Sequence, residues 1–120
     1  MRERAKPPDD ISPLEFFTRW LPASVAEDHE RRERLGDTAA LIVFDLHGEQ
    51  VGTFSLQVAN GVLVGSEGRA AEADLEVRVD CETWRALNRG DLAAPEALLR
   101  RKLQISGKFV LALKLHLILG

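Results

Sequence analysis

Residues 108–120 read KFVLALKLHLILG and form a strongly apolar run. The rest of the fold depends on what buries these side chains. As a helix, the eleven residues 109–119 would reach only about 16 Å, whereas the hydrocarbon core of a bilayer is about 30 Å thick. A simple membrane span is therefore excluded for this run. At 100° per residue, Lys108, Lys114 and His116 project in three separate directions, which does not give the broad basic face of a surface-lying helix. The run must be covered by the protein itself, by a second chain or by a ligand.

The secondary structure of this run is ambiguous from its pattern alone. Residues 111–117, LALKLHL, alternate strictly between apolar and other positions, as a half-buried strand would. Leu, Ala and Lys nevertheless favour helices, and β-branched residues are few. A helix here would be apolar on almost every side, so it would have to be covered on almost every side.

Working backwards from this run, the residues that precede it predict strands. KLQISG, residues 102–107, reads as a strand with Leu103 and Ile105 pointing inward, and Gly107 separates it from the closing run. DLEVRVD, residues 74–80, alternates without a fault and places Val77 and Val79 on one face together with a leucine.

Three further strands are expected between residues 38 and 65. TAALIVFDL is apolar at nearly every position, which is typical of a strand covered on both faces. VGTFSLQV alternates, with Phe54, Leu56 and Val58 on one side, and VLVG follows as a short strand. HGEQ and ANG form the joints, and SEGRAAEA predicts a loop. Together with DLEVRVD, these segments predict a meander of four strands.

Helices are expected before and between the strands. Ser12 can cap a first helix near residues 13–20, and Pro22 is expected to break or kink it before a second, charged helix begins around residue 23 and ends at Gly36. Asp80 can cap a short helix that ends at Gly90. Another helix follows it, with a proline and a glutamate in its first turn.

The order of elements predicts an α+β fold of two layers: a five-stranded, mostly antiparallel sheet covered by helices on one face. At 120 residues the chain is long enough for one domain with a real core. The charged, proline-containing start lacks the apolar segment of a secretory signal. We therefore expect a flexible tail over residues 1–10 and a single domain over residues 11–120.

Composition narrows the function classes. Asp and Glu outnumber Lys and Arg by 19 to 16, which argues against nucleic acid as a partner, because phosphate binding needs a concentrated positive surface. The single cysteine, Cys81, excludes an intramolecular disulfide and fits a reducing compartment, so we expect the cytoplasm. We expect a monomer or a weak homodimer, no metal and no cofactor. Transient contact with a membrane stays open.

Three segments in this order resemble the sterol carrier protein type 2 family of small lipid-binding domains. They are the hairpin FDLHGEQVGTFSLQVANGVLVGSEG, the strand and helices of ADLEVRVDCETWRALNRGDLAAPEALLRRKL, and the strand and closing run of KLQISGKFVLALKLHLIL. The resemblance implies an apolar cavity between sheet and helices, in which a fatty acid, fatty acyl-CoA, sterol or isoprenoid lipid is bound, with the closing run as a helical wall. The family has no catalytic motif, so the resemblance implies a carrier, not an enzyme.

The residues expected on the cavity wall come from the inward sides of the strands, the middle helix and the closing helix. They are Phe54, Leu56, Val77, Val79, Trp84, Leu87, Leu103, Ile105, Phe109, Leu113 and Leu117. For each of them the alternative is an ordinary core side chain.

Polar candidates carry less weight. Asp45, His47 and Glu49 alternate and could resemble a metal set, but Gly48 indicates a solvated hairpin turn instead. Cys81 lies next to acidic neighbours, which blunt a nucleophile, so we expect a structural role.

Two other functions remain open from the sequence. One is a structural or interaction domain that dimerises, or docks on a lipid-metabolising enzyme, through its apolar C-terminal helix. The other is an enzyme acting on a lipid in the cavity, with His116 or a carboxylate as the acid or base.

Overall fold

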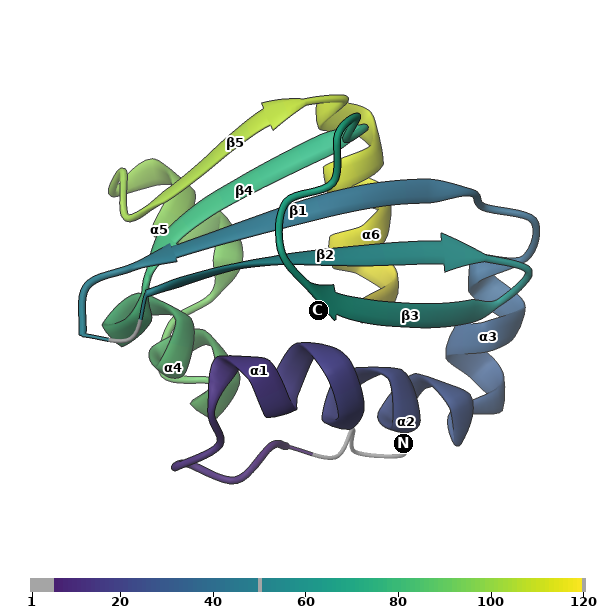
Figure 1. Cartoon of the computed structure of the whole chain (residues 1–120), viewed down its shortest axis with the longest axis horizontal. Coiled ribbons are helices and arrows are strands. Elements are labelled where there is room, and N and C mark those ends of the chain that lie inside the picture. The colour runs from purple at the N-terminus through teal and green to yellow at the C-terminus, as the bar shows by residue number, and fades with distance from the viewer. Residues whose placement is uncertain (1–5, 50, 120) are drawn as a thin grey trace.

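The computed structural model describes residues 6–49 and 51–119, with side chains described up to His116 (Figure 1). The helices are α1 (Pro13–Glu15), η1 (Phe16–Trp20), α2 (Leu21–Ala26), α3 (His29–Leu35), α4 (Cys81–Arg89), α5 (Ala94–Leu99) and α6 (Phe109–Leu119). The strands are β1 (Ala40–His47), β2 (Gly52–Ala59), β3 (Val62–Glu67), β4 (Leu75–Asp80) and β5 (Leu103–Gly107).

The strands form one five-stranded sheet in the order β3-β2-β1-β4-β5. β1 and β4 are parallel, and the other three neighbouring pairs are antiparallel. Every helical segment except α1 contributes to apolar clusters on one face of this sheet, which we call the inner face. The predicted α+β fold with a mostly antiparallel sheet is confirmed.

The predicted four-stranded meander is wrong, because β4 pairs with β1 and not with β3. Residues 68–74, which we call the strap, cross the outer face of the sheet to reach β4 (Figure 1). The apolar character of β1 on both sides explains its central position. Ile42 on the inner face is 1% exposed and Val43 on the outer face is fully buried, so this strand needs a neighbour at each edge and a cover on each face.

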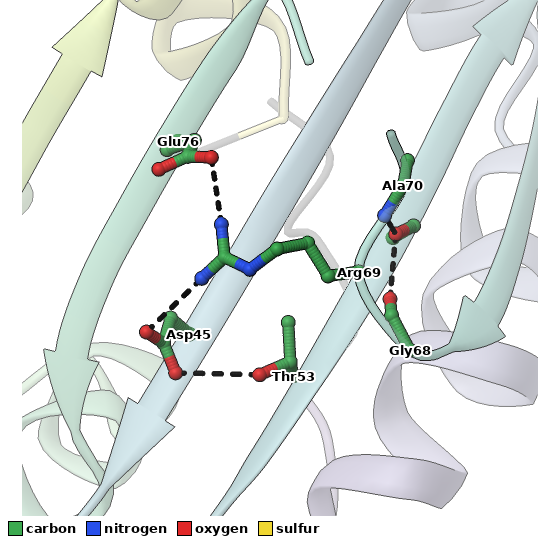
Figure 2. Close-up of polar contacts among 7 residues, drawn as sticks. Asp45, Thr53, Gly68, Arg69, Ala70 and Glu76 are labelled. Carbon is green, nitrogen blue, oxygen red and sulfur yellow. Dashed lines mark hydrogen bonds and ion pairs between the residues drawn. The ribbon is translucent and has the colours of Figure 1, made fainter. Parts of the chain in front are cut away.

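The strap is fastened to β2 by hydrogen bonds (Figure 2). The hydroxyl of Ser55 donates to the carbonyl oxygen of Gly68 over 2.6 Å and accepts from the amide of Ala70 over 2.9 Å. The amide of Gly68 donates to the carbonyl oxygen of Thr53. Ser55 is buried, so its hydroxyl depends on these strap partners for hydrogen bonds.

Arg69 of the strap joins the two parallel strands (Figure 2). Its guanidinium lies 2.7 Å from the carboxylate of Glu76 on β4 and 3.3 Å from the carboxylate of Asp45 on β1. Asp45 is therefore engaged by Arg69 rather than free at a hairpin tip.

A break at Pro22, one of the two outcomes that the sequence predicts there, does not occur. α1, η1 and α2 follow one another without a gap, and the break falls after Ala26 instead. The η1 segment is π-helical, with the amide of Leu21 donating to the carbonyl oxygen of Phe16. This wider spacing accommodates a residue without an amide hydrogen, so Pro22 is tolerated in the first turn of α2.

Helix ends elsewhere follow the sequence. Ser12 accepts a hydrogen bond from the amide of Glu15, and Asp80 accepts one from the amide of Thr83. Gly90 ends α4 in the left-handed conformation. The ambiguous closing run forms the helix α6, as propensity indicates and strict alternation does not.

The predicted tail, residues 1–10, lies partly outside the described residues. Within its described part, the ammonium group of Lys6 contacts the carbonyl oxygen of Arg89, and Arg85 donates to the carbonyl oxygen of Asp9. These residues therefore lie against α4.

No helix within residues 6–49 and 51–119 combines the length and hydropathy that crossing a bilayer requires.

Candidate functional site

A row of apolar side chains crosses the inner face of the sheet. Phe44 on β1 lies opposite Phe54 on β2 and, on its other side, opposite Val77 on β4. Val77 in turn lies opposite Ile105 on β5. We call these four residues the inner row.

Burial changes along the inner row. Phe54 is 3% exposed, whereas Phe44, Val77 and Ile105 are only partly buried although they face the helices. These three side chains, with Leu21 of α2, pack against both of the core clusters. The inner row therefore marks the boundary between the two clusters, where apolar surface of the sheet stays accessible.

Aromatic rings form the first wall of this boundary. The ring of Phe17 lies 4.7 Å from that of Phe44, 5.1 Å from that of Phe54 and 6.1 Å from that of Trp84, between centroids. Phe16 packs edge-on against Trp84. Because these rings pack against one another, they form a continuous surface, which we call the aromatic wall.

α6 forms the opposite wall and contacts α3, β4 and β5. Leu115 anchors it in the second cluster at 6% exposure, and Leu111 and Ala112 pack there while remaining partly buried. Phe109 and Leu113 are 55% and 54% exposed. The helix is thus attached along one side and carries uncovered apolar side chains on another.

Asp74 fixes the position at which α6 leaves the sheet. Its carboxylate accepts a 2.9 Å hydrogen bond from the amide of Leu41 and lies 3.1 Å from the ammonium group of Lys108. The amide of Lys108 donates to the carbonyl oxygen of Asp74. The hydrogen bond from Leu41, followed by that from Lys108, lowers the pKa of Asp74 below its ordinary value. Gly107, at φ +104°, makes the turn beside it.

The arrangement offers an apolar surface between two walls, with its polar anchor at the root of α6. The sequence profile of the SCP-2 sterol transfer family matches residues 17–120 of the chain. The chain belongs to this family. The resemblance to sterol carrier protein type 2 domains is therefore confirmed, and with it the assignment to a lipid- and sterol-binding class of domain.

One relative of this chain is much longer than the chain itself. The chain is 32% identical over 112 residues to hydroxysteroid dehydrogenase-like protein 2 of Xenopus tropicalis, covering 92% of this chain but 26% of the relative. The chain thus spans about a quarter of the length of that relative.

Solved structures share the fold at low identity. Palmitated SCP2L2 from Aedes aegypti superposes with a TM-score of 0.73 at 19% identity, over 89% of this chain and 94% of that one. The stereoselective inverting sec-alkylsulfatase Pisa1 from Pseudomonas sp. superposes at 0.71 and 19% identity, over 92% of this chain and 16% of the enzyme. At these identities the likeness concerns the fold alone.

The SCP-2 fold distributes the predicted wall residues over three environments. Phe54, Val79, Trp84 and Leu103 are buried in the first cluster, with Leu87 partly buried against it, and Leu56 is buried in the second cluster. Val77 and Ile105 are brought together in the inner row. Phe109 and Leu113 lie on the exposed side of α6, and the side chain of Leu117 lies outside the described residues.

Sequence reasoning missed Phe44, Leu21, Leu111 and Ala112 as candidates. Phe44 alternates with Ile42 along β1, but the run there is apolar on both faces, so its pattern does not show which face meets the helices. Its position next to Val77 follows from the parallel pairing of β1 and β4, for which the sequence holds no local signal.

None of the polar candidates belongs to the inner row. Cys81 is buried in the first cluster at the start of α4. His116 is partly buried on α6, and His47 is exposed at the end of β1. A separate open hollow of about 230 Å³ lies on the outer face, and its lining includes Ser55, Gln57 and Arg69.

Proposed function

We propose that this chain is a non-enzymatic carrier that binds one apolar lipid over the inner row, between the aromatic wall and α6. The observation that carries the proposal is the incomplete burial of Phe44, Val77 and Ile105 beneath the helices. Apolar side chains at the centre of a sheet are normally covered, so uncovered ones at the junction of two clusters indicate a place for an apolar ligand.

The energetics need no reactive group. Removing a methylene from water contributes about 0.8 kcal/mol, so a sixteen-carbon chain contributes on the order of 12 kcal/mol before ordering costs. One methylene more or less changes binding by only about 1–3 kcal/mol, which favours broad selectivity. Fatty acids, fatty acyl-CoA, sterols and isoprenoid lipids all fit this requirement, and family membership supports the class.

Filling the inner row tests the proposal. Val77→Phe adds a ring at the centre of the row and is expected to weaken binding of a fluorescent fatty acid about 10-fold or more, without large loss of stability, because the ring fills the volume that the ligand would occupy. If the row is instead closed by protein, the same change overpacks it and costs about 1–3 kcal/mol of unfolding free energy. Fluorescence titration and urea unfolding measure the two effects.

Val64→Phe is the matched control for this substitution. Val64 lies on the edge strand β3 and is 58% exposed, so the same change there is expected to leave lipid affinity unaltered. Equal affinity of the two variants, or the absence of saturable binding by the unaltered chain, would contradict the proposal.

A second candidate is an interaction domain that dimerises or docks on an enzyme through α6. The exposed side of α6 favours it, since Phe109, Val110 and Leu113 are each more than half exposed. Sedimentation velocity separates the two candidates. Val110→Gln with Leu113→Gln is expected to dissociate an oligomer whose interface is the exposed side of α6. A chain that is monomeric before and after the substitution excludes the dimer.

A further inference from the structure

The turn between α5 and β5 presents an unusual combination of side chains. Its residues 99–102, which we call the basic tip, are Leu99, Arg100, Arg101 and Lys102. Leu99 is 85% exposed, and the three cations that follow it are all exposed. A leucine projecting into solvent among cations is not explained by the core or by the inner row.

The basic tip is held rigidly. Ala97, fully buried, and Leu103, 7% exposed, anchor the chain on either side of it. The amide of Lys102 donates to the carbonyl oxygen of Ala97, and that of Arg101 donates to the carbonyl oxygen of Leu98. Arg101 has a φ of +60°, the left-handed conformation that reverses a chain at a helix end. The backbone of the turn is therefore held in place, and its exposed side chains project from a defined position.

The charges of the basic tip are largely available to a partner. Arg100 lies 2.7 Å from the carboxylate of Glu96, one turn earlier in α5. Arg101 and Lys102 form no ion pair with any residue in 6–49 or 51–119 whose side chain is described. Since the whole chain carries a net charge of −3, this cationic surface is a local feature that an anionic partner would recognise.

We propose that the basic tip docks the protein on the surface of a bilayer that contains anionic phospholipids. Leu99 enters the boundary between headgroups and acyl chains, while Arg101 and Lys102 contact phosphate groups. A single projecting turn buries too little area for a specific protein interface, which takes about 800 Å² from each partner, whereas a bilayer needs no matching shape. Charge and shape thus both favour a membrane as the occupant.

The position of the basic tip relates this surface to the inner row. The tip leads directly into β5, and Ile105 of the inner row lies on that strand. Docking through the basic tip does not require a lipid over the inner row. Vesicle binding can therefore be measured on the chain without added fatty acid.

Vesicle co-sedimentation tests the docking. The chain is expected to bind phosphatidylcholine vesicles that contain phosphatidylserine more tightly than pure phosphatidylcholine vesicles, and this preference is expected to fall at high ionic strength. Arg101→Gln with Lys102→Gln is expected to weaken binding to the anionic vesicles about 10-fold or more. Leu99→Gln is expected to weaken it at either ionic strength.

Matched controls separate the basic tip from general charge. Arg19→Gln with Arg32→Gln makes the same change in net charge on two exposed helical residues elsewhere. Leu14→Gln removes another exposed leucine, on α1. These controls are expected to bind as the unaltered chain does. The proposal is overturned if the unaltered chain shows no preference for anionic vesicles, or if the tip variants bind as tightly as the controls.

Fatty acid titration of the same variants keeps this proposal distinct from the carrier function. The tip variants are expected to bind fluorescent fatty acid with unchanged affinity, since none of the altered residues belongs to the inner row. Loss of vesicle binding with retained fatty acid binding supports docking through the tip.

Discussion

Gly65 shows how one missing side chain permits the contact between helix and sheet. It lies on β3 opposite Leu56, and a Cβ added to it would overlap the backbone carbonyl group of Phe17. The backbone of η1 therefore rests directly on the strand. This approach places Phe17 among the rings of the aromatic wall, so Gly65 supports the candidate site from a distance.

Gly65→Ala is expected to destabilise the chain by about 1–3 kcal/mol, because the added methyl group must push η1 away from β3. Urea unfolding measures the change. Ser66→Ala, at the next residue, is the control. The side chain of Ser66 is exposed, so the loss of its hydroxyl is expected to leave stability nearly unchanged. Equal stability of Gly65→Ala and the unaltered chain would show that η1 moves without cost.

At the scale of elements, the strap sets how the sheet is connected. The strap, seven residues from 68 to 74, replaces the short turn of a meander and allows β4 to lie parallel to β1. Arg69 crosses between those strands at Asp45 and Glu76. Phe44 precedes Asp45 in the sequence, and Val77 follows Glu76. Both apolar side chains therefore lie on the opposite face of the sheet, in the inner row.

The two attachments of the strap are expected to differ in strength. Ser55→Ala removes the partner of the Ala70 amide beneath the strap and is expected to cost about 1–3 kcal/mol. Arg69→Gln removes ion pairs whose members are about half exposed and is expected to cost less than about 1 kcal/mol. Urea unfolding gives both values. A larger loss for Arg69→Gln would contradict the assignment of Ser55 as the main fastening.

At the scale of the whole molecule, stability depends on pH through two carboxylates at junctions of the fold. Burial alone would raise the pKa of Asp80, but hydrogen bonds from the hydroxyl and amide of Thr83 outweigh it and lower the pKa. The pKa of Asp74 is lowered by the hydrogen bond from Leu41 and by Lys108. One carboxylate caps α4, and the other joins β1 to the start of α6.

The sign of this pH dependence follows from both pKa values lying below the ordinary 3.8 in the folded chain. Near pH 4 the unfolded chain binds more protons than the folded one, so lowering the pH favours unfolding. The stabilisation is expected to be complete above about pH 5 and to be lost as the pH falls below about 4.

Urea unfolding between pH 3 and pH 7 measures this loss. Asp74→Asn with Asp80→Asn should flatten the acid side of the profile, because an amide cannot take up the proton. A double variant that loses stability as steeply as the unaltered chain would show that other groups govern the acid transition.

Much of the fold was predictable because local chemistry settled it. The caps at Ser12 and Asp80, the stop at Gly90 and the alternation around Val77 act over a few residues, and the structure agrees with them. The expected break at Pro22 is absent, because the π-helical segment before it accommodates a residue that has no amide hydrogen to donate. Phe16 and Phe17 of that segment are buried, and no local sequence pattern reports their burial.

The sequence by itself determined the α+β class and the excess of apolar side chains in the closing run, whose helical form is seen in the structure. Only the tertiary structure decided that β4 lies beside β1, that Phe44 meets Val77, and that the two core clusters leave this pair partly covered. The physical reason is that a residue's neighbours along the chain fix its backbone and its face, whereas strand order and residual exposure depend on contacts between segments far apart in the chain.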